Sequence, residues 1–260
     1  MEISLKQRRA VVCGASRGIG RAVALVLAEC GAELVVLARS EDALGTLVEG
    51  LPGGARRHRS RAVDFNDTSA TADVFAGIAG EGPVHVLVNN TGGPPAGRAF
   101  DAAPDDYLAA FRQHLVAAQL AARALVPGMQ AEGYGRIVNI ISTSVKEPIP
   151  GLGVSNTIRG AMASWAKTLS RELAADGITV NNVLPGFTAT ERLDYLFRQR
   201  AAKSGGSPEQ MAEAARAQVP AGRFARPEET AWAVAFLVSD RAAYINGVSL
   251  PVDGGRTGCL

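Results

Sequence analysis

Short apolar runs rich in β-branched residues alternate with longer segments whose apolar residues recur at helical spacing, and this alternation restricts the fold more than any other feature. Strands are predicted at 9–13, 33–38, 61–64, 84–89, 136–141, 178–184 and 248–252. Helices are predicted at about 18–30, 40–49, 68–80, 104–131, 153–176 and 227–239. Because the strand runs are continuously apolar, helices should cover both faces of the sheet. The sequence therefore predicts an α/β fold with one doubly wound, parallel sheet of about seven strands.

Residues 1–260 are predicted to form a single domain, because 260 residues of 47% apolar composition can bury one large core. The segment 188–222 is a polar, charge-rich departure from the pattern, with further helices predicted inside 188–218 and a flexible stretch at 203–210. Such an excursion is typical of a lid over a site. Apolar residues here would contact an acyl chain or ring of a substrate, or would close the lid against the domain; they are Phe187, Leu193, Tyr195, Leu196 and Phe197.

Charge and composition argue against several classes of partner. The net charge is only +2, and the basic cluster at 56–61 contains no aromatic residue that could stack on a base, so no nucleic-acid surface is expected. No apolar run approaches the roughly 18 residues needed to span a bilayer. The cysteines at 13, 30 and 259 are odd in number and lack the spacing of metal ligands. These features favour a cytoplasmic protein with reduced thiols and no metal site.

A glycine-rich turn follows the first predicted strand. Gly14, Gly18 and Gly20 have the spacing G-x3-G-x-G, with Ser16, Arg17 and Ile19 between them, immediately before an apolar helix. Glycine permits a tight turn and lets backbone approach phosphate closely, while the start of the helix offers free N–H groups to an anion. The turn therefore predicts a dinucleotide site at the carboxyl end of the strands.

The end of the second strand indicates which dinucleotide is bound. An acidic residue there would hold the ribose hydroxyl of NAD, whereas an arginine accommodates the phosphate of NADP. Arg39 and Ser40 occupy these positions and Arg17 adds a second cation, so NADP(H) is favoured over NAD(H); alternatively, both arginines are ordinary surface residues. Asp64, followed by Phe65, could accept a hydrogen bond from adenine or could cap the next helix.

Several further motifs occur in a characteristic order along the whole chain. They are GASRGIG at 14–20, NNTGG at 89–93, GRIVNIIS at 135–142, NNVLPGFTAT at 181–190, RPEETA at 226–231 and VDGG at 252–255. With them the chain resembles the short-chain dehydrogenase/reductase family, most closely the 3-oxoacyl-[acyl-carrier-protein] reductase type. The resemblance implies a Rossmann-type fold, an NADP(H)-dependent oxidoreductase and a small-molecule substrate.

The resemblance also implies cofactor contacts further along the chain. Asn90, Thr91 and Gly92 would line the middle of the cofactor. The nicotinamide end would contact Pro185, Gly186, Thr188 and Thr190. Asn, Gly and Pro also suit the turns that end strands, so each of these residues has a local explanation as well.

The catalytic residues of the family are only partly matched. The family uses a serine to polarise the carbonyl, a tyrosine to protonate it, a lysine to lower the tyrosine pKa and hold the ribose, and a helical asparagine to support a water chain. Ser142 matches the serine. Ser155 stands where the tyrosine is expected, Arg159 replaces the lysine, and His114 replaces the asparagine.

These replacements have different chemical consequences. Arg159 keeps the positive charge and can bond ribose hydroxyls, but its high pKa prevents it from transferring protons. Ser155 is far less acidic than a phenol, so the proton would come from a bound water or from another group. His114 has a suitable unperturbed pKa of about 6.5, although a histidine on a helix often serves only packing.

Three hypotheses remain open. The protein could reduce a carbonyl, or an activated C=C or C=N bond, with a non-standard proton donor. It could instead bind NADP without turnover beside an active homologue, or catalyse a non-redox reaction on the same fold. The resemblance implies a homodimer or homotetramer formed through 104–131 and 153–176, or a hetero-oligomer with an active homologue.

Overall fold

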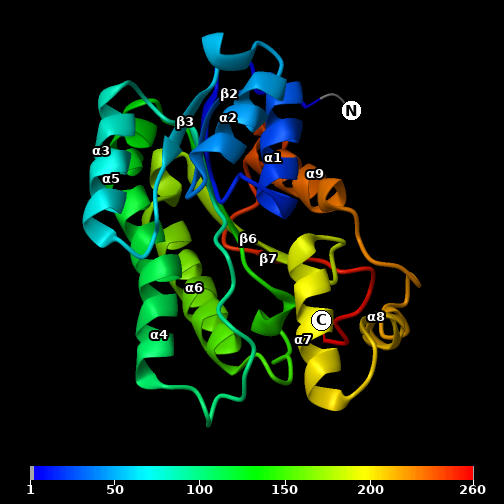
Figure 1. Ribbon diagram of the computed structural model, residues 1–260. Helices are drawn as coiled ribbons and strands as arrows, with labels where there is room; N and C mark the ends of the chain where they lie inside the picture. The colour runs from blue at the N-terminus through cyan, green and yellow to red at the C-terminus, as the bar shows by residue number, and fades with distance from the viewer. Residues whose placement is uncertain (1–2, 260) are drawn as a thin grey trace.

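The computed structural model describes residues 3–259, which contain one seven-stranded sheet in the order β3-β2-β1-β4-β5-β6-β7 (Figure 1). Every neighbouring pair of strands is parallel. The strands are β1 Arg9–Cys13, β2 Glu33–Ala38, β3 Arg59–Ala62, β4 Val86–Asn89, β5 Gly135–Ile140, β6 Ile178–Pro185 and β7 Ser249–Val252. The predicted fold class is confirmed, and the strand ends move by at most a few residues.

Helices cover both faces of the sheet because successive strand residues face opposite sides. Val12 and Val36 pack in the core on one face, and Val11 and Val35 pack in the core on the other. The first face is covered by α1 Gly18–Glu29, α2 Glu41–Gly50 and α9 Pro227–Val238. The second face is covered by α3 Thr68–Gly80, α5 Ala117–Ala131 and α6 Gly153–Glu172 (Figure 1).

The chain adds strands to one side of β1 first and to its other side afterwards. From β1 the order runs outward to β2 and β3, and then continues on the other side with β4. In a doubly wound sheet this switch point opens a crevice at the carboxyl ends of the strands, where ligands bind. The glycine turn after β1 and the NNTGG segment after β4 therefore meet at this position.

The predicted helix 104–131 is not continuous. It consists of α4 Pro104–Phe111, a π-helical turn at Arg112–Val116 and α5 Ala117–Ala131. π turns inside helices are rare and occur frequently at functional sites. Here the turn carries His114, the residue predicted either to donate a proton or to serve only packing.

The lid segment, defined as residues 188–222, contains α7 Glu191–Ser204 and α8 Pro208–Arg216. Figure 1 shows both helices lying beyond the end of the sheet, apart from the layers that cover its faces. The stretch predicted to be flexible, 203–210, is partly helical: it contains the end of α7, the turn at 205–207 and the start of α8. Gly205 ends α7 with φ 74°, and the Ser207 hydroxyl accepts a hydrogen bond from the backbone of Gln210 to begin α8.

Most apolar residues of the lid segment close it internally. Leu193 and Phe197 are buried together with Ala215, and the rings of Phe187 and Phe224 pack against Phe197. The chain entering and the chain leaving the segment are held together, since the Ala189 N–H donates to the Ala225 carbonyl and the Ala225 N–H donates to the Phe187 carbonyl. This packing favours lid closure over substrate contact for these side chains, whereas Tyr195 is exposed.

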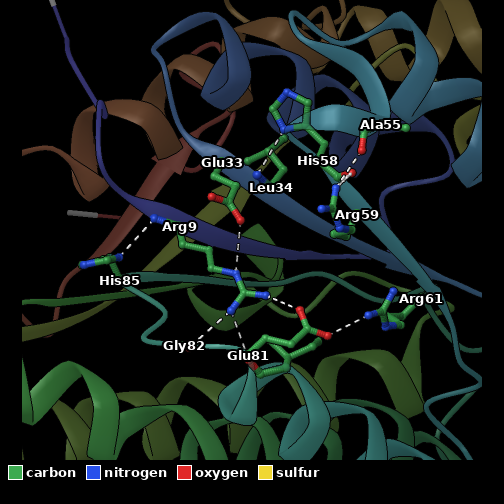
Figure 2. Close-up of polar contacts among 11 residues, drawn as sticks. Arg9, Glu33, Leu34, Ala55, His58, Arg59, Arg61, Glu81, Gly82 and His85 are labelled. Carbon is green, nitrogen blue, oxygen red and sulfur yellow. Dashed lines mark hydrogen bonds and ion pairs between the residues drawn. The ribbon is translucent and has the colours of Figure 1, made fainter.

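The basic cluster near β3 has structural partners (Figure 2). Arg61 and Arg9 both bond the carboxylate of Glu81, at 2.7 and 2.6 Å. The buried His58 ring accepts a hydrogen bond from the Leu34 backbone at 3.1 Å. These contacts tie strand ends together and give Arg61 and His58 structural roles. Within residues 3–259, no helix is both long and apolar enough to cross a membrane.

Candidate functional site

The glycine turn is tight and is held against β4. Gly14 and Gly18 have positive φ angles of 62° and 56°, which side-chain-bearing residues rarely adopt. A Cβ on Gly20 would lie 2.2 Å from the carbonyl oxygen of Gly14, so only glycine fits there. The Asn90 side-chain amide donates to the carbonyls of Cys13 and Gly14 at 3.3 and 3.2 Å. The asparagine expected to touch the cofactor therefore also fixes the turn.

The turn leaves the start of α1 open to an anion. Arg17 at the N-cap provides no side-chain cap, and the first turn of α1 contains no acidic residue. The helix dipole and unpaired N–H groups can therefore act on a ligand. Thr190 lies against this turn, since its methyl group would be 3.4 Å from a Cβ on Gly18. These features fit the diphosphate of a dinucleotide.

The end of β2 provides an exposed cationic position. Arg39 and Ser40 are both exposed, and the Ser40 hydroxyl caps α2 by accepting from Ala43 at 3.3 Å. Arg17, expected as a second cation, instead forms an ion pair with Glu191 of the lid segment at 3.2 Å. Exposed pairs of this kind contribute little to stability, so Arg17 can exchange Glu191 for a phosphate.

The remaining nucleotide candidates differ in accessibility. Asp64 is exposed and accepts from the Asn66 backbone at 3.0 Å; Asp67, not Asp64, caps α3, so that alternative was wrong. The Phe65 side chain is buried in the core beside Phe75, which leaves its backbone as the part that a nucleotide could contact.

At the opposite end of the site, Pro185 ends β6 and the Gly186 N–H donates to Val252 at 3.0 Å. Thr188 is buried, and its hydroxyl donates to the Gly186 carbonyl at 3.3 Å. Gly92 is exposed in the loop after β4. The residues matched to the nicotinamide end therefore lie where β6 enters the lid segment.

Ser142 follows β5 with its hydroxyl oriented by backbone. Its oxygen accepts a hydrogen bond from the Ser144 N–H at 3.1 Å. Within residues 3–259 no acceptor takes the hydroxyl proton, so it is available to donate to a ligand oxygen. Ser155 is half-buried in the first turn of α6. A Cβ on Gly153 would lie 2.3 Å from the Ala99 backbone nitrogen, and this close contact fixes where α6 begins.

Arg159 is a buried cation, and no carboxylate within residues 3–259 pairs with it. Its side chain lies on the same face of α6 as Ser155, and Nη1 donates to the Ile140 carbonyl at 3.1 Å. Burial and the nearby Arg192 guanidinium lower the pKa of Arg159 to about 10. The group therefore remains positively charged at neutral pH.

His114 is directed inward by the π turn and is only 4% exposed. Its Nδ1 is hydrogen-bonded to the Thr91 hydroxyl, whereas its buried Nε2 has no hydrogen-bond partner within residues 3–259. Burial and the charge of Arg159 lower the pKa of His114 well below its ordinary value. The unperturbed value of about 6.5 therefore does not describe His114 in the fold, and the imidazole is neutral near pH 7.

A small internal cavity joins these groups beneath the carboxyl ends of β1, β4 and β5. Its volume is about 10 Å³, which suffices for about one water molecule. The polar residues around it are Asn89, Asn90, Thr91, His114 and Arg159. The cavity therefore places His114 and Arg159 around one common space.

Two features of the site were missed in the sequence. Asn89, Asn139, Asn182 and Ser249 form a buried chain of side-chain hydrogen bonds across β4, β5, β6 and β7. Repeated asparagines within apolar strands were its only signal. Arg192 in the first turn of α7 donates to the Pro94 carbonyl at 2.7 Å, and no spacing rule distinguishes it from other lid arginines.

Fold and site together define a dinucleotide-binding α/β protein of the oxidoreductase type, with a glycine turn at the switch point and polar groups at the ends of β4 and β5. A family model described as enoyl-(acyl carrier protein) reductase matches residues 14–257. The chain belongs to the short-chain dehydrogenase/reductase family.

Relatives cover nearly the full chain. NADPH-dependent reductase BacG of Bacillus subtilis is 32% identical over 96% of this chain and 98% of its own length. The 3-oxoacyl-[acyl-carrier-protein] reductase FabG of Vibrio cholerae is 33% identical over 97% and 98%. L-Sorbose reductase from Gluconobacter frateurii, solved with NADPH and L-sorbose, is similar in structure with TM-score 0.93, 31% identity and full coverage of both chains.

Proposed function

We propose that the protein is an NADPH-dependent reductase of a small carbonyl compound. NADPH, when bound, would supply the hydride. The open start of α1, the exposed Arg39 and the glycine turn fit NADPH, and relatives described as NADPH-dependent or solved with NADPH support this cofactor. The lid segment would cover the substrate during the reaction.

The observation that carries this proposal is the orientation of Ser142. Its oxygen accepts from the Ser144 N–H, and no acceptor within residues 3–259 takes its proton, so the hydroxyl can donate to a ligand. A substrate carbonyl oxygen gains negative charge as hydride reaches its carbon, and a fixed donor stabilises that charge.

The proton is proposed to come from water. Ser155 has no phenol, Arg159 retains its proton, and neutral His114 cannot act as an imidazolium acid. A neutral imidazole can still accept a proton at one nitrogen and release one at the other. His114 lines the cavity, its buried Nε2 has no hydrogen-bond partner within residues 3–259 and its Nδ1 is bonded to Thr91, so a cavity water could pass a proton to the substrate oxygen through this pair.

The serine at 155, where the family has a tyrosine, favours a second candidate function, a cofactor-binding subunit without turnover. The loss of a positioned acid typically lowers a rate by about 10²–10⁴-fold. A subunit that binds NADPH beside an active homologue would tolerate such a loss. In that case the protein would still bind NADPH but would not turn over a substrate.

The experiment measures NADPH and NADH binding together with NADPH oxidation over ketones, imines and enones. We expect NADPH to bind more tightly than NADH. Turnover should fall by about 10²-fold or more in Ser142→Ala, the loss typical of removing one hydrogen-bond donor to an oxyanion. NADPH binding without turnover, even with an active homologue present, would contradict the reductase proposal. Binding of neither nucleotide would favour a non-redox reaction.

Assembly and location are also proposed. Leu108 and Phe111 are exposed one turn apart on α4, where a second copy could cover them to form a homodimer or homotetramer. An active homologue could occupy the same face in a hetero-oligomer. The three cysteines are free thiols, which suits a reducing cytoplasm.

A further inference from the structure

Two guanidinium groups converge beside the loop that follows β4. A side-chain carbon placed on Gly93 would lie 3.6 Å from Nη2 of Arg192 and 4.0 Å from Nη2 of Arg159. One arginine comes from α6 of the domain and the other from α7 of the lid segment. Both nitrogens therefore lie within about 4 Å of the same point.

The structure supplies no negative charge to this pair. Among residues 3–259, the ion pairs of aspartate and glutamate involve neither Arg159 nor Arg192. Their protein partners are the neutral carbonyls of Ile140 and Pro94. Arg159 is only 8% exposed, and a buried charge without a counter-ion is costly.

Each arginine uses only part of its donor capacity. A guanidinium has five N–H donors arranged for the planar geometry of a carboxylate. Nη1 of Arg159 is bonded to Ile140, which leaves Nη2 directed toward Gly93. Nη2 of Arg192 already donates one proton to the Pro94 carbonyl, and the exposed side chain has further N–H groups for an incoming ligand.

We infer that Arg159 and Arg192 bind a carboxylate of the substrate, so that the preferred substrates are oxo acids and not neutral ketones or thioesters. This inference rests on the proposed reductase function. The carboxylate would supply the missing counter-charge, and its bond to Arg192 would hold the lid segment over the reacting carbonyl. The diphosphate of the cofactor has its own site at the glycine turn and α1.

The test compares two acids with their neutral esters: benzoylformate with methyl benzoylformate, and levulinate with methyl levulinate. The pairs differ in the spacing between carbonyl and carboxylate. Binding to the protein saturated with NADP⁺ is measured by calorimetry, and reduction is measured with NADPH. We expect at least one acid to bind about 10- to 100-fold more tightly than its ester, the range of charge-assisted hydrogen bonds.

Variants distinguish this site from a general lid effect. Arg192→Gln should remove the preference for the acid while leaving ester binding and the NADPH dissociation constant within about twofold. Arg192→Lys should retain part of the preference because it keeps the charge. Arg198→Gln, on an exposed position of the same helix, should retain all of it.

Equal binding of acids and esters by the native protein would overturn the inference. A loss of NADPH affinity in Arg192→Gln, without a selective loss of the acid, would assign the arginines to the cofactor phosphates and would also overturn it. Selective binding of an acid that is never reduced would leave the carboxylate site standing and would contradict the reductase function instead.

Discussion

The side-chain amide of Asn139 donates to Oδ1 of Asn182 at 2.9 Å, in the fully buried centre of the sheet. The two residues are register partners on β5 and β6. Asn139 also accepts from Asn89 on β4 at 2.8 Å. Because the hydrogen bonds continue to Ser249, the chain crosses β4, β5, β6 and β7 and ties together the strands that lead to the site.

Asn139→Leu should destabilise the protein by about 2–4 kcal/mol, since it leaves a buried donor on Asn89 and a buried acceptor on Asn182 without partners. The free energy of unfolding in urea measures the effect. Gln199→Leu, at an exposed position on α7, is the control and should change stability by less than about 0.5 kcal/mol. Equal effects of the two substitutions would contradict a structural role for the amide chain.

Gly20→Ala should weaken NADPH binding by tenfold or more. The added methyl would meet the Gly14 carbonyl at 2.2 Å, so the turn must open and lose its shape for the diphosphate. Gly45→Ala is the matched control, because nothing lies within 4 Å of a Cβ there and alanine is favoured inside α2. The NADPH dissociation constant is measured by titration followed through NADPH fluorescence. An unchanged affinity in Gly20→Ala would place the cofactor elsewhere.

His114 should stay neutral at pH 6. Burial and Arg159 lower its pKa well below 6.5, so its ring protonates only at more acidic pH. Its ring nitrogen and carbon resonances, followed by NMR from pH 8 to 5 and assigned with His114→Asn, provide the measurement. A midpoint at or above about 6.5 would restore the imidazolium as a candidate acid and would contradict the water route.

Glu229→Gln should lower the melting temperature by about 2–4 °C at pH 7, as expected for losing about 1 kcal/mol of helix capping. Hydrogen bonds from Arg223 and from the Arg226 backbone lower the pKa of Glu229 from 4.5 to about 2. The ionised carboxylate thus stabilises the folded state above pH 4.5, and this stabilisation is lost as the pH falls toward 2.

The difference between native protein and Glu229→Gln should therefore shrink below pH 4.5 and vanish near pH 2. Calorimetric scans at a series of pH values follow it. Glu228→Gln, one residue earlier in the same turn, controls for a general charge effect. A difference that is constant with pH would show that the Arg223 contact does not depend on the ionised carboxylate.

Much of the fold could be predicted because its causes are local. Continuous apolar runs such as the one at Val11 and Val12 require cover on both faces, and glycines at 14 and 20 permit a tight turn that other residues would hinder. Spacing along α6 also places Ser155 and Arg159 on one face. These relations depend on residues that are neighbours in the chain.

The break in the helix at Arg112–Val116 could not be predicted, since helical spacing continues through it. The pKa of His114 was equally hidden, because it depends on burial and on Arg159, 45 positions further along the chain. Arg192 lies in the site only because the lid segment brings α7 close to the loop that follows β4. Each of these features depends on contacts between elements that are far apart in the sequence, so residue spacing does not predict it.

The sequence alone determined the layers, the glycine turn and the chemical identity of the groups at the site: a serine hydroxyl, an arginine charge and no phenol. Only the tertiary structure decided that His114 is neutral, that no carboxylate of residues 3–259 pairs with Arg159 and that Arg192 lies beside it. Residue type fixes which protons and charges a group can carry. Burial and distance to other charges, which come from packing, decide which of them it does carry.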